Sequence, residues 1–279
     1  EPIEIIISDD ASSDNTYAII EQAIAGYTGP NKILTNRNTK NMGIIAHTNK
    51  IIEVAKGEVL IPSYGDDISL PNRSSRIVAE FDKHNPLLIH SHAIPIDEKG
   101  KKVKSKYNDA IFYKTINPLD ISTSLSHYLG ASGAWHRKLF SKYGPIRSEL
   151  VYDDHILGFR AALEKKVHFI NEPLLYYREG VGISHSKNKN LSKSSNKLNR
   201  IKILKQAIAV YTERKEDAFK FGLKYNDPII KKLELALVKN ISRLSYYQDK
   251  GIIIKSFLEN PKITTNAILS ELLRDLWRR

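Results

Sequence analysis

The sequence contains no cysteine among its 279 residues, so a disulfide framework is excluded. A chain without thiols suits a reducing compartment, and we expect a cytoplasmic protein. Long apolar runs are also absent. One of the longest, Ile3–Ile7, is interrupted by Glu4 and is far too short to span a bilayer. The content of 41% hydrophobic and 27% charged residues is typical of a globular protein with a substantial core.

Positive charge is present in excess, and it is concentrated in the last third of the chain. The net charge is +12, and residues 190–279 hold 19 Lys and Arg against nine Asp and Glu, an excess of ten. Such a region indicates an anionic partner, such as a membrane surface or a phosphate-bearing substrate, or else a solvated lysine-rich surface. It lacks the basic stripe with interleaved aromatics typical of nucleic-acid binding, so we expect no nucleic-acid partner.

The first 110 residues alternate between strand-like and helix-like segments. Strands are predicted at residues 3–8, 31–36, 58–64 and 86–96, and helices at residues 16–27, 44–56 and 70–84. This alternation predicts an α/β fold with a mostly parallel, Rossmann-like sheet flanked by helices. Sheets of this kind bind ligands at the carboxyl ends of their strands.

The remainder of the chain changes character twice. We expect an α/β domain at residues 1–186, a basic polar linker or loop at 187–200, and a helical basic extension at 201–279. The last helix carries a predicted apolar stripe. Its residues are Ile268, Leu269, Leu272, Leu273, Leu276 and Trp277. The stripe is explained equally well by packing on the domain or in an oligomer and by docking on anionic headgroups.

Three adjacent pairs of aspartates stand out. Asp9–Asp10 and Asp66–Asp67 follow strands, and Asp153–Asp154 begins a helix. Each pair alone is explained by turn formation or by helix capping. A carboxylate at a strand end can also accept the imide N–H of uracil, and adjacent carboxylates suit a hard divalent cation. Three pairs in this arrangement together indicate one binding site.

The motifs around these pairs occur in a specific order. They are DDASSDNT at residues 9–16, Asn41 and Gly43 followed by Asn49, KGEVLIPSYGDDISLPNR at 56–73, GASGAWHRKLF at 130–140, and DDHILGFR at 153–160. This set resembles family 2 glycosyltransferases, which have the GT-A fold and use nucleotide-activated sugars. The similarity extends from residue 1 to about residue 186.

The resemblance implies a role for each matching residue. Donor-binding residues would be Asp9, Asp10, Asn41, Gly43, Asn49 and Asp66. Metal-binding residues would be Asp66, Asp67 and His185, holding Mg²⁺ or Mn²⁺ against the diphosphate. Asp154 would be the catalytic base, and Gly130, Ala131 and Asp153 would lie on the acceptor side. His185 is equally well read as a solvated loop residue.

The implied activity is an inverting, metal-dependent hexosyl transfer. The expected donor is a UDP-sugar, and the expected acceptor is a glycan or lipid-linked glycan of bacterial-type surface polysaccharide synthesis. Such a protein would lie at the inner face of the cell membrane as a peripheral protein, and its C-terminal helices could form an oligomer.

Two departures from the family pattern support an alternative. Relatives place a central strand and a Tyr-Asn turn ahead of the first acidic pair, and this sequence begins after them. Many relatives also have an aspartate where Tyr64 stands. The alternative hypothesis is therefore a non-catalytic remnant of the fold, or a nucleotide-binding module.

Overall fold

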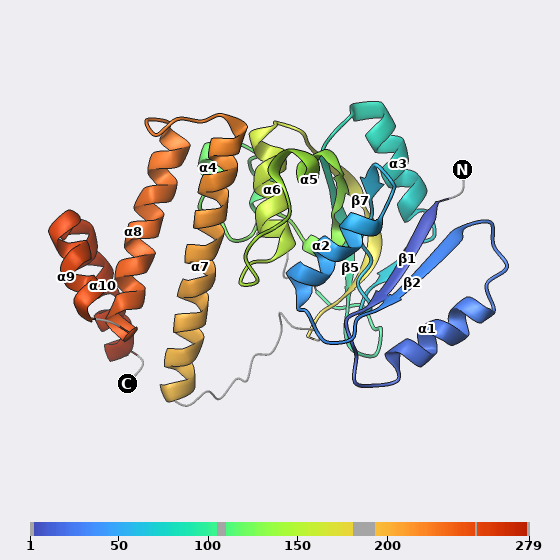
Figure 1. The fold of residues 1–279 in the computed structure, drawn as a ribbon, viewed down its shortest axis with the longest axis horizontal. Coiled ribbons are helices and arrows are strands. Elements are labelled where there is room, and N and C mark those ends of the chain that lie inside the picture. Colours follow the sequence, from blue (N-terminus) through green and yellow to red (C-terminus); the bar gives the residue numbers. More distant parts are fainter. Residues whose placement is uncertain (1–2, 105–109, 181–192, 249, 278–279) are drawn as a thin grey trace.

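The computed structural model describes residues 3–104, 110–180, 193–248 and 250–277, and its ribbon is shown in Figure 1. The strands combine β-branched, leucine and aromatic residues. They are β1 (Glu4–Asp9), β2 (Lys32–Arg37), β3 (Val59–Leu60), β4 (Ile68–Ser69), β5 (Leu88–Ile96), β6 (Ala134–His136) and β7 (Val167–Arg178). The strands predicted from the sequence are confirmed, although the third is much shorter than expected.

The strands form two sheets. Strand β1 pairs with β2 in parallel, and the second sheet has the order β3-β6-β5-β7-β4. In this second sheet β5 and β7 are parallel, whereas the pairs β3–β6, β5–β6 and β4–β7 are antiparallel. The α/β class is confirmed, but the second sheet is mixed rather than mostly parallel. Its short strands β4 and β6 follow loops, and antiparallel neighbours need no crossover helix.

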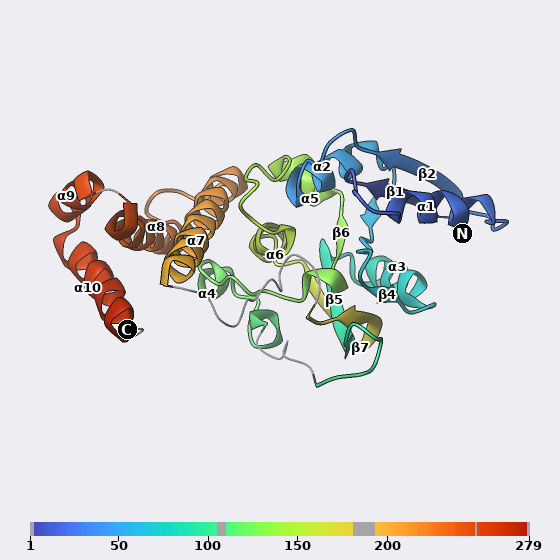
Figure 2. The same ribbon diagram turned by 90° about the horizontal axis from the view of Figure 1, so that it is seen from below.

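Helices surround the sheets and extend to one end of the molecule (Figures 1 and 2). They are α1 (Thr16–Ala25), α2 (Ile44–Val54), α3 (Arg73–His84), α4 (Pro118–Ile121), α5 (Lys138–Tyr143), α6 (Asp153–Leu163), α7 (Lys193–Phe221), α8 (Pro228–Gln248), α9 (Lys250–Glu259) and α10 (Pro261–Trp277). Two short 3₁₀ helices, η1 (Ile111–Tyr113) and η2 (Gly130–Ser132), lie between β5 and β6.

One hydrophobic core joins the α/β part to the first C-terminal helices. It contains Ile45 of α2, Ile156 of α6, Val210 of α7 and Ile230 of α8. The expected helical extension is therefore confirmed, and α7 and α8 share a core with the sheet. The prediction of a linker or loop at 187–200 is wrong for residues 193–200, which form the first turns of α7. Their Lys, Asn and Leu residues are compatible with a helix, and polarity alone did not distinguish helix from loop.

The last two helices lie at the end of the molecule away from β1 and β2 (Figure 2). Helix α10 packs against α8 and buries Thr264, Ala267 and Glu271. The expected apolar stripe is not the packed face, because Leu272, Leu273 and Leu276 are 40%, 53% and 57% exposed. Within the described residues, no helix has the length and apolarity needed to cross a membrane.

Candidate functional site

The first acidic pair lies at the end of β1, where the backbone turns sharply. Ala11 has a φ of 59°, so the chain leaves the strand in the left-handed region. Asp9 is buried, accepts the Ser12 N–H at 3.1 Å and lies 3.6 Å from the Arg37 guanidinium. Asp9 therefore stabilises the turn and links β1 to β2.

Asp10 organises the loop that precedes α2. Its carboxylate accepts the Asn38 amide at 2.7 Å and the backbone N–H groups of Met42 and Gly43 at 2.9 and 3.0 Å. Burial acts to raise the pKa of Asp10, but these donors and the His47 ring outweigh it, so the pKa is lowered. Gly43 has a φ of 80°, and its N–H also faces the Asn41 side chain at 3.0 Å. The structure thus brings Asp10, Asn41 and Gly43 together.

Three polar residues that the sequence analysis did not single out complete this cluster. Asn38 is buried and contacts Asp10, the His47 ring at 2.8 Å and the Lys50 ammonium at 2.6 Å. His47 and Lys50 lie on α2, one turn or less apart. This spacing was the only feature of the sequence that could have indicated that the two side chains share a face of the helix. The His47 ring lies 3.7 Å from the carboxylate of Asp10, and Asn38 connects that carboxylate to Lys50.

Asn49 has other partners. Its amide donates to the carbonyl of Ile146 at 2.7 Å and accepts the Ile146 N–H at 3.1 Å. These two bonds attach α2 to the segment after α5, so the side chain of Asn49 is directed at the protein backbone.

The second acidic pair lies in the loop between β3 and β4. Asp66 is exposed and Asp67 is half-buried. The Asp67 carboxylate accepts the Arg178 N–H at 2.9 Å, and the Arg178 side chain donates to the carbonyls of Asp66, Asp97 and Glu98. Burial and the neighbouring Asp66 raise the pKa of Asp67 to about 6, against the opposing effects of Arg73 and Arg178.

A buried arginine connects this loop to the turn that contains Ala131. Arg73, at the start of α3, is 2% exposed and donates to the carbonyls of Pro62 and Ala131, each at 2.9 Å. It also donates to the Ser69 hydroxyl at 2.9 Å. The sequence analysis overlooked Arg73, although it follows the second acidic pair within one motif.

Tyr64 connects the second and third acidic pairs. Its hydroxyl donates to Asp153 Oδ2 at 2.6 Å, across 89 residues of sequence. Burial, together with Asp153, raises the pKa of Tyr64 well above its ordinary value, so the phenol remains a donor. The position where many relatives carry an aspartate thus holds a hydroxyl that binds the first residue of α6.

Asp154 has the most unusual environment of these carboxylates. Its Oδ1 is buried, has no hydrogen-bond partner among the described residues and lies 3.8 Å from His155 Nε2. Burial raises the pKa of Asp154, and burial together with the charge of Asp154 raises that of Asp153. A Cβ added at Gly130 would lie 3.4 to 3.6 Å from the Asp154 side chain, so η2 lies in contact with this carboxyl.

The first turn of α6 is held by an arginine from α7. Arg214 is fully buried and donates to the carbonyl of His155 at 2.7 and 3.0 Å, and to those of Ser122 and Ser124 at 2.8 and 2.7 Å. Its charge also acts to lower the pKa of Asp154. A residue of the C-terminal helices thereby positions the third acidic pair.

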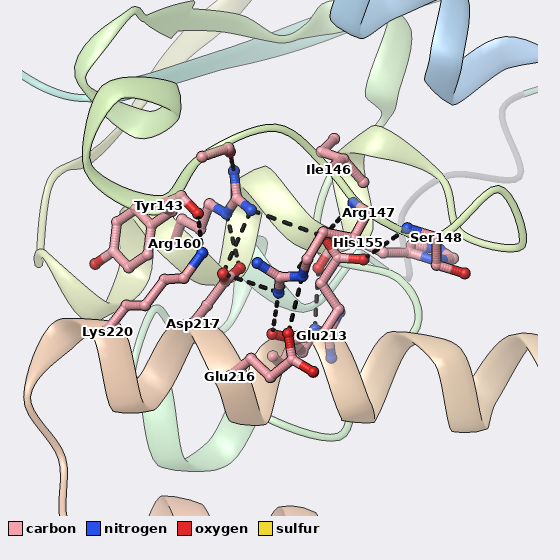
Figure 3. A network of polar contacts seen from close by, with 12 residues as sticks. Tyr143, Ile146, Arg147, Ser148, His155, Arg160, Glu213, Glu216, Asp217 and Lys220 are labelled. Carbon is pink, nitrogen blue, oxygen red and sulfur yellow. Dashed lines mark hydrogen bonds and ion pairs between the residues drawn. The ribbon is translucent and has the colours of Figure 1, made fainter.

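Two acidic residues of α7 form a second set of contacts, shown in Figure 3. Asp217 pairs with the buried Arg160 of α6 at 2.7 Å, and Glu213 accepts the backbone N–H groups of Arg147 and Ser148 at 2.9 and 3.1 Å. Helix α7 is thus fixed to α6 and to the loop ahead of it by buried charges. His185, the remaining predicted site residue, lies outside the described residues.

Comparisons with known proteins identify the chain. The family model of glycosyl transferase family 2 matches residues 1–144, so the chain belongs to this family. It is therefore a glycosyltransferase. The sequence is similar to Rv1520 of Mycobacterium tuberculosis, an uncharacterised protein, with 23% identity covering all of this chain and 78% of the relative. It is also similar to the putative glycosyltransferase EpsE of Bacillus subtilis, with 36% identity over 29% of this chain and 28% of the relative.

Solved structures show the same fold. TarS of S. aureus, residues 1–349, crystallised in complex with UDP-GlcNAc, covers 97% of this chain and 82% of its own with a TM-score of 0.52 and 14% identity. The GT-A fold expected from the motifs is confirmed.

Proposed function

We propose that this protein transfers a sugar from a UDP-sugar to a hydroxyl of a glycan or lipid-linked glycan, with inversion at the anomeric carbon. The observation that carries this proposal is the environment of Asp154. It is a partly buried carboxyl with a raised pKa, and one of its oxygens has no hydrogen-bond partner among the described residues. A carboxylate with a raised pKa is a stronger base than an ordinary aspartate, as general-base catalysis requires.

In this proposal Asp154 accepts the proton of the acceptor hydroxyl while that oxygen attacks the sugar. Tyr64 and Asp153 hold the start of α6, and Arg214 holds it from the opposite side. Attack opposite to the departing diphosphate inverts the anomeric centre. The turn at Gly130 and Ala131 forms the acceptor side because it lies against Asp154.

The Asp66–Asp67 loop suits a divalent cation. Both side chains offer hard oxygen ligands, and burial together with the neighbouring Asp66 raises the pKa of Asp67, so a bound cation would favour its ionised form. In the described residues only these two carboxylates are available at the loop, so phosphate and water would complete the shell. Bound Mg²⁺ or Mn²⁺ would supply charge that stabilises the diphosphate leaving group.

The cluster around Asp10 is proposed to bind the nucleotide. The carboxylate of Asp10 binds the loop that holds Asn41 and Gly43, and a uridine imide could also donate to this carboxylate. TarS, a similar structure, was crystallised with UDP-GlcNAc, which supports a UDP-sugar as the donor to test first.

The test is a calorimetric titration of UDP in the presence of Mn²⁺ and then of EDTA. We expect binding that needs the cation and that is lost in Asp67→Ala. The control is Asp14→Ala, which changes an exposed turn carboxylate bonded to Thr16. Failure to bind either UDP or GDP would favour the alternative of a non-catalytic remnant, and binding without turnover of any UDP-sugar would favour a nucleotide-binding module.

We further propose peripheral binding to an anionic membrane at its inner face through α9 and α10. Their exposed apolar side chains include Ile254, Phe257, Leu258, Leu273 and Leu276. Exposed apolar residues beside excess basic charge are typical of helices that lie on anionic headgroups. A lipid-linked acceptor in surface polysaccharide synthesis would be reached from that position.

A further inference from the structure

A second group of potential metal ligands lies outside the proposed active site. Glu80 and His84 are one turn apart on α3, and His168 is the second residue of β7. Glu80 Oε2 lies 3.2 Å from His84 Nε2 and 3.0 Å from His168 Nε2. Potential ligand atoms of the three residues all lie within 4.8 Å of one another. The sequence analysis did not find this group because 84 residues separate His84 from His168.

We infer that Glu80, His84 and His168 form a binding site for a divalent transition-metal ion such as Zn²⁺. Tetrahedral zinc holds its ligand atoms about 3.4 Å apart, given bond lengths near 2.1 Å. The contacts from the glutamate oxygen to the two imidazole nitrogens are close to that spacing, so small rotations of the side chains would accommodate the ion.

The carboxylate is already oriented for this role. The other oxygen of Glu80, Oε1, lies 3.2 Å from the Arg76 guanidinium, which itself is 2.6 Å from Glu172. Arg76 therefore holds the oxygen that faces away from the histidines and leaves Oε2 directed at both rings. Partners of this kind, outside the ligand shell, orient the carboxylates of metal sites.

The site is accessible, so water can complete the coordination. The side chains of His84, His168 and Glu80 are 38%, 27% and 14% exposed. Two imidazoles and one carboxylate are the ligand set of many zinc sites, whereas Mg²⁺ prefers oxygen ligands only. The ion expected here is thus chemically different from the one proposed at Asp66 and Asp67.

The position of the site indicates a stabilising role. His168 lies at the start of β7, and Arg178, which contacts Asp67, lies at its end. Ten residues of strand separate them, roughly 30 Å at about 3.3 Å per residue. The ion would clamp the end of α3 to the start of β7, far from the sugar-transfer chemistry.

The test is calorimetric titration of the full chain with Zn²⁺ at neutral pH, with excess Mg²⁺ present to occupy the oxygen site. We expect one equivalent of Zn²⁺ to bind, with the affinity falling about tenfold or more in His84→Ala and in His168→Ala. The control His92→Ala changes a half-buried histidine that contacts Asn171 and packs on Tyr113, and it should bind Zn²⁺ normally. We also expect Zn²⁺ to raise the Tm of the unaltered chain and not that of Glu80→Gln.

The outcomes are decisive in both directions. Absence of Zn²⁺ binding, or equal affinity in all three histidine variants, would overturn the inference and leave the group as polar contacts between Glu80 and the two imidazoles. Asp67→Ala should still bind Zn²⁺ at Glu80, His84 and His168. Loss of UDP binding in this variant and loss of Zn²⁺ binding in the histidine variants therefore test the two proposals separately.

Discussion

Asp154 combines three features that rarely occur together in a structural aspartate: partial burial, an oxygen with no hydrogen-bond partner among the described residues, and proximity to the turn at Gly130. A hydrogen bond from the His155 N–H also acts to lower its pKa, as expected of a carboxylate in the first turn of a helix. Asp153 directs both of its oxygens at the protein, since Oδ1 accepts the Asp154 N–H at 2.7 Å and Oδ2 accepts the Tyr64 hydroxyl at 2.6 Å. The two neighbours therefore have different functions in the proposal.

Replacing Asp154 by asparagine should abolish sugar transfer while retaining UDP binding. Loss of a general base reduces turnover by about 10²- to 10⁴-fold. Burial raises the pKa of Asp154, so the charged form costs stability in the folded state, and Asp154→Asn should not lower the Tm. Turnover of a UDP-sugar and a thermal melt test both parts. Transfer at the normal rate in this variant would exclude Asp154 as the base.

Metal-dependent UDP binding should weaken as the pH falls through about 6. The pKa of Asp67 is raised to about 6, so its carboxyl is mostly ionised above that pH and mostly protonated below it. A protonated carboxyl is a poor cation ligand, and its proton must be released before the ion binds. Calorimetric UDP affinity with Mn²⁺ between pH 5 and 8 checks this, and a flat profile would contradict it.

Among the helices, α7 contributes most to the position of the proposed base. It supplies Arg214 to the first turn of α6 and Asp217 to Arg160 further along the same helix (Figure 3). If the catalytic domain ended at residue 200, Arg214 and Asp217 would lie in a different domain from their partners in α6. The helical extension is therefore part of the structure that forms the proposed site.

Asp217→Asn should lower the free energy of unfolding by about 3 kcal/mol, because it removes the nearer of the two carboxylates that pair with the buried Arg160 and leaves Glu213 at 3.7 Å. The neighbouring Glu216→Gln is the matched control. Glu216 pairs with Arg147 at the surface, with the two side chains 50% and 32% exposed, and its loss should cost less than about 1 kcal/mol. Urea unfolding of both variants measures the difference, and equal costs would show that α7 is held by apolar packing alone.

At the scale of the whole molecule, apolar and basic surface is concentrated at the C-terminal end. The stripe on α10 remains exposed because the helix uses its opposite face, with Ala267 and Glu271, to pack on α8. A second copy of the chain is the competing occupant of this surface, as expected for an oligomer formed by the C-terminal helices.

Flotation with anionic liposomes should recover the unaltered chain and lose it when Leu273 and Leu276 are replaced by glutamine. The two leucines are 53% and 57% exposed, so their replacement should leave the fold intact. Ile19→Gln, at a 63% exposed site on α1, is the matched control and should float normally. If all variants float equally while the leucine changes convert a dimer to a monomer in light scattering, the surface is an oligomer interface instead.

The sequence by itself determined the local elements and the order of the motifs. Strands such as 86–96 and helices such as 44–56 follow from periodicity, since side-chain spacing directly reflects which face is buried. The three acidic pairs were evident because two of them follow predicted strands and the third begins a predicted helix. The family was evident from the motifs around these pairs, because each motif consists of residues close together in the chain.

Only the tertiary structure decided which distant residues meet. Tyr64 bonds Asp153 across 89 residues, Arg214 reaches Ser122 across 92, and Asn49 binds Ile146 across 97. Three other features could not be predicted from the sequence. They are the mixed sheet, the inclusion of residues 193–200 in α7 and the Glu80–His84–His168 group. Each depends on packing between segments whose separation along the chain carries no periodic signal, so their proximity is set by the shared core.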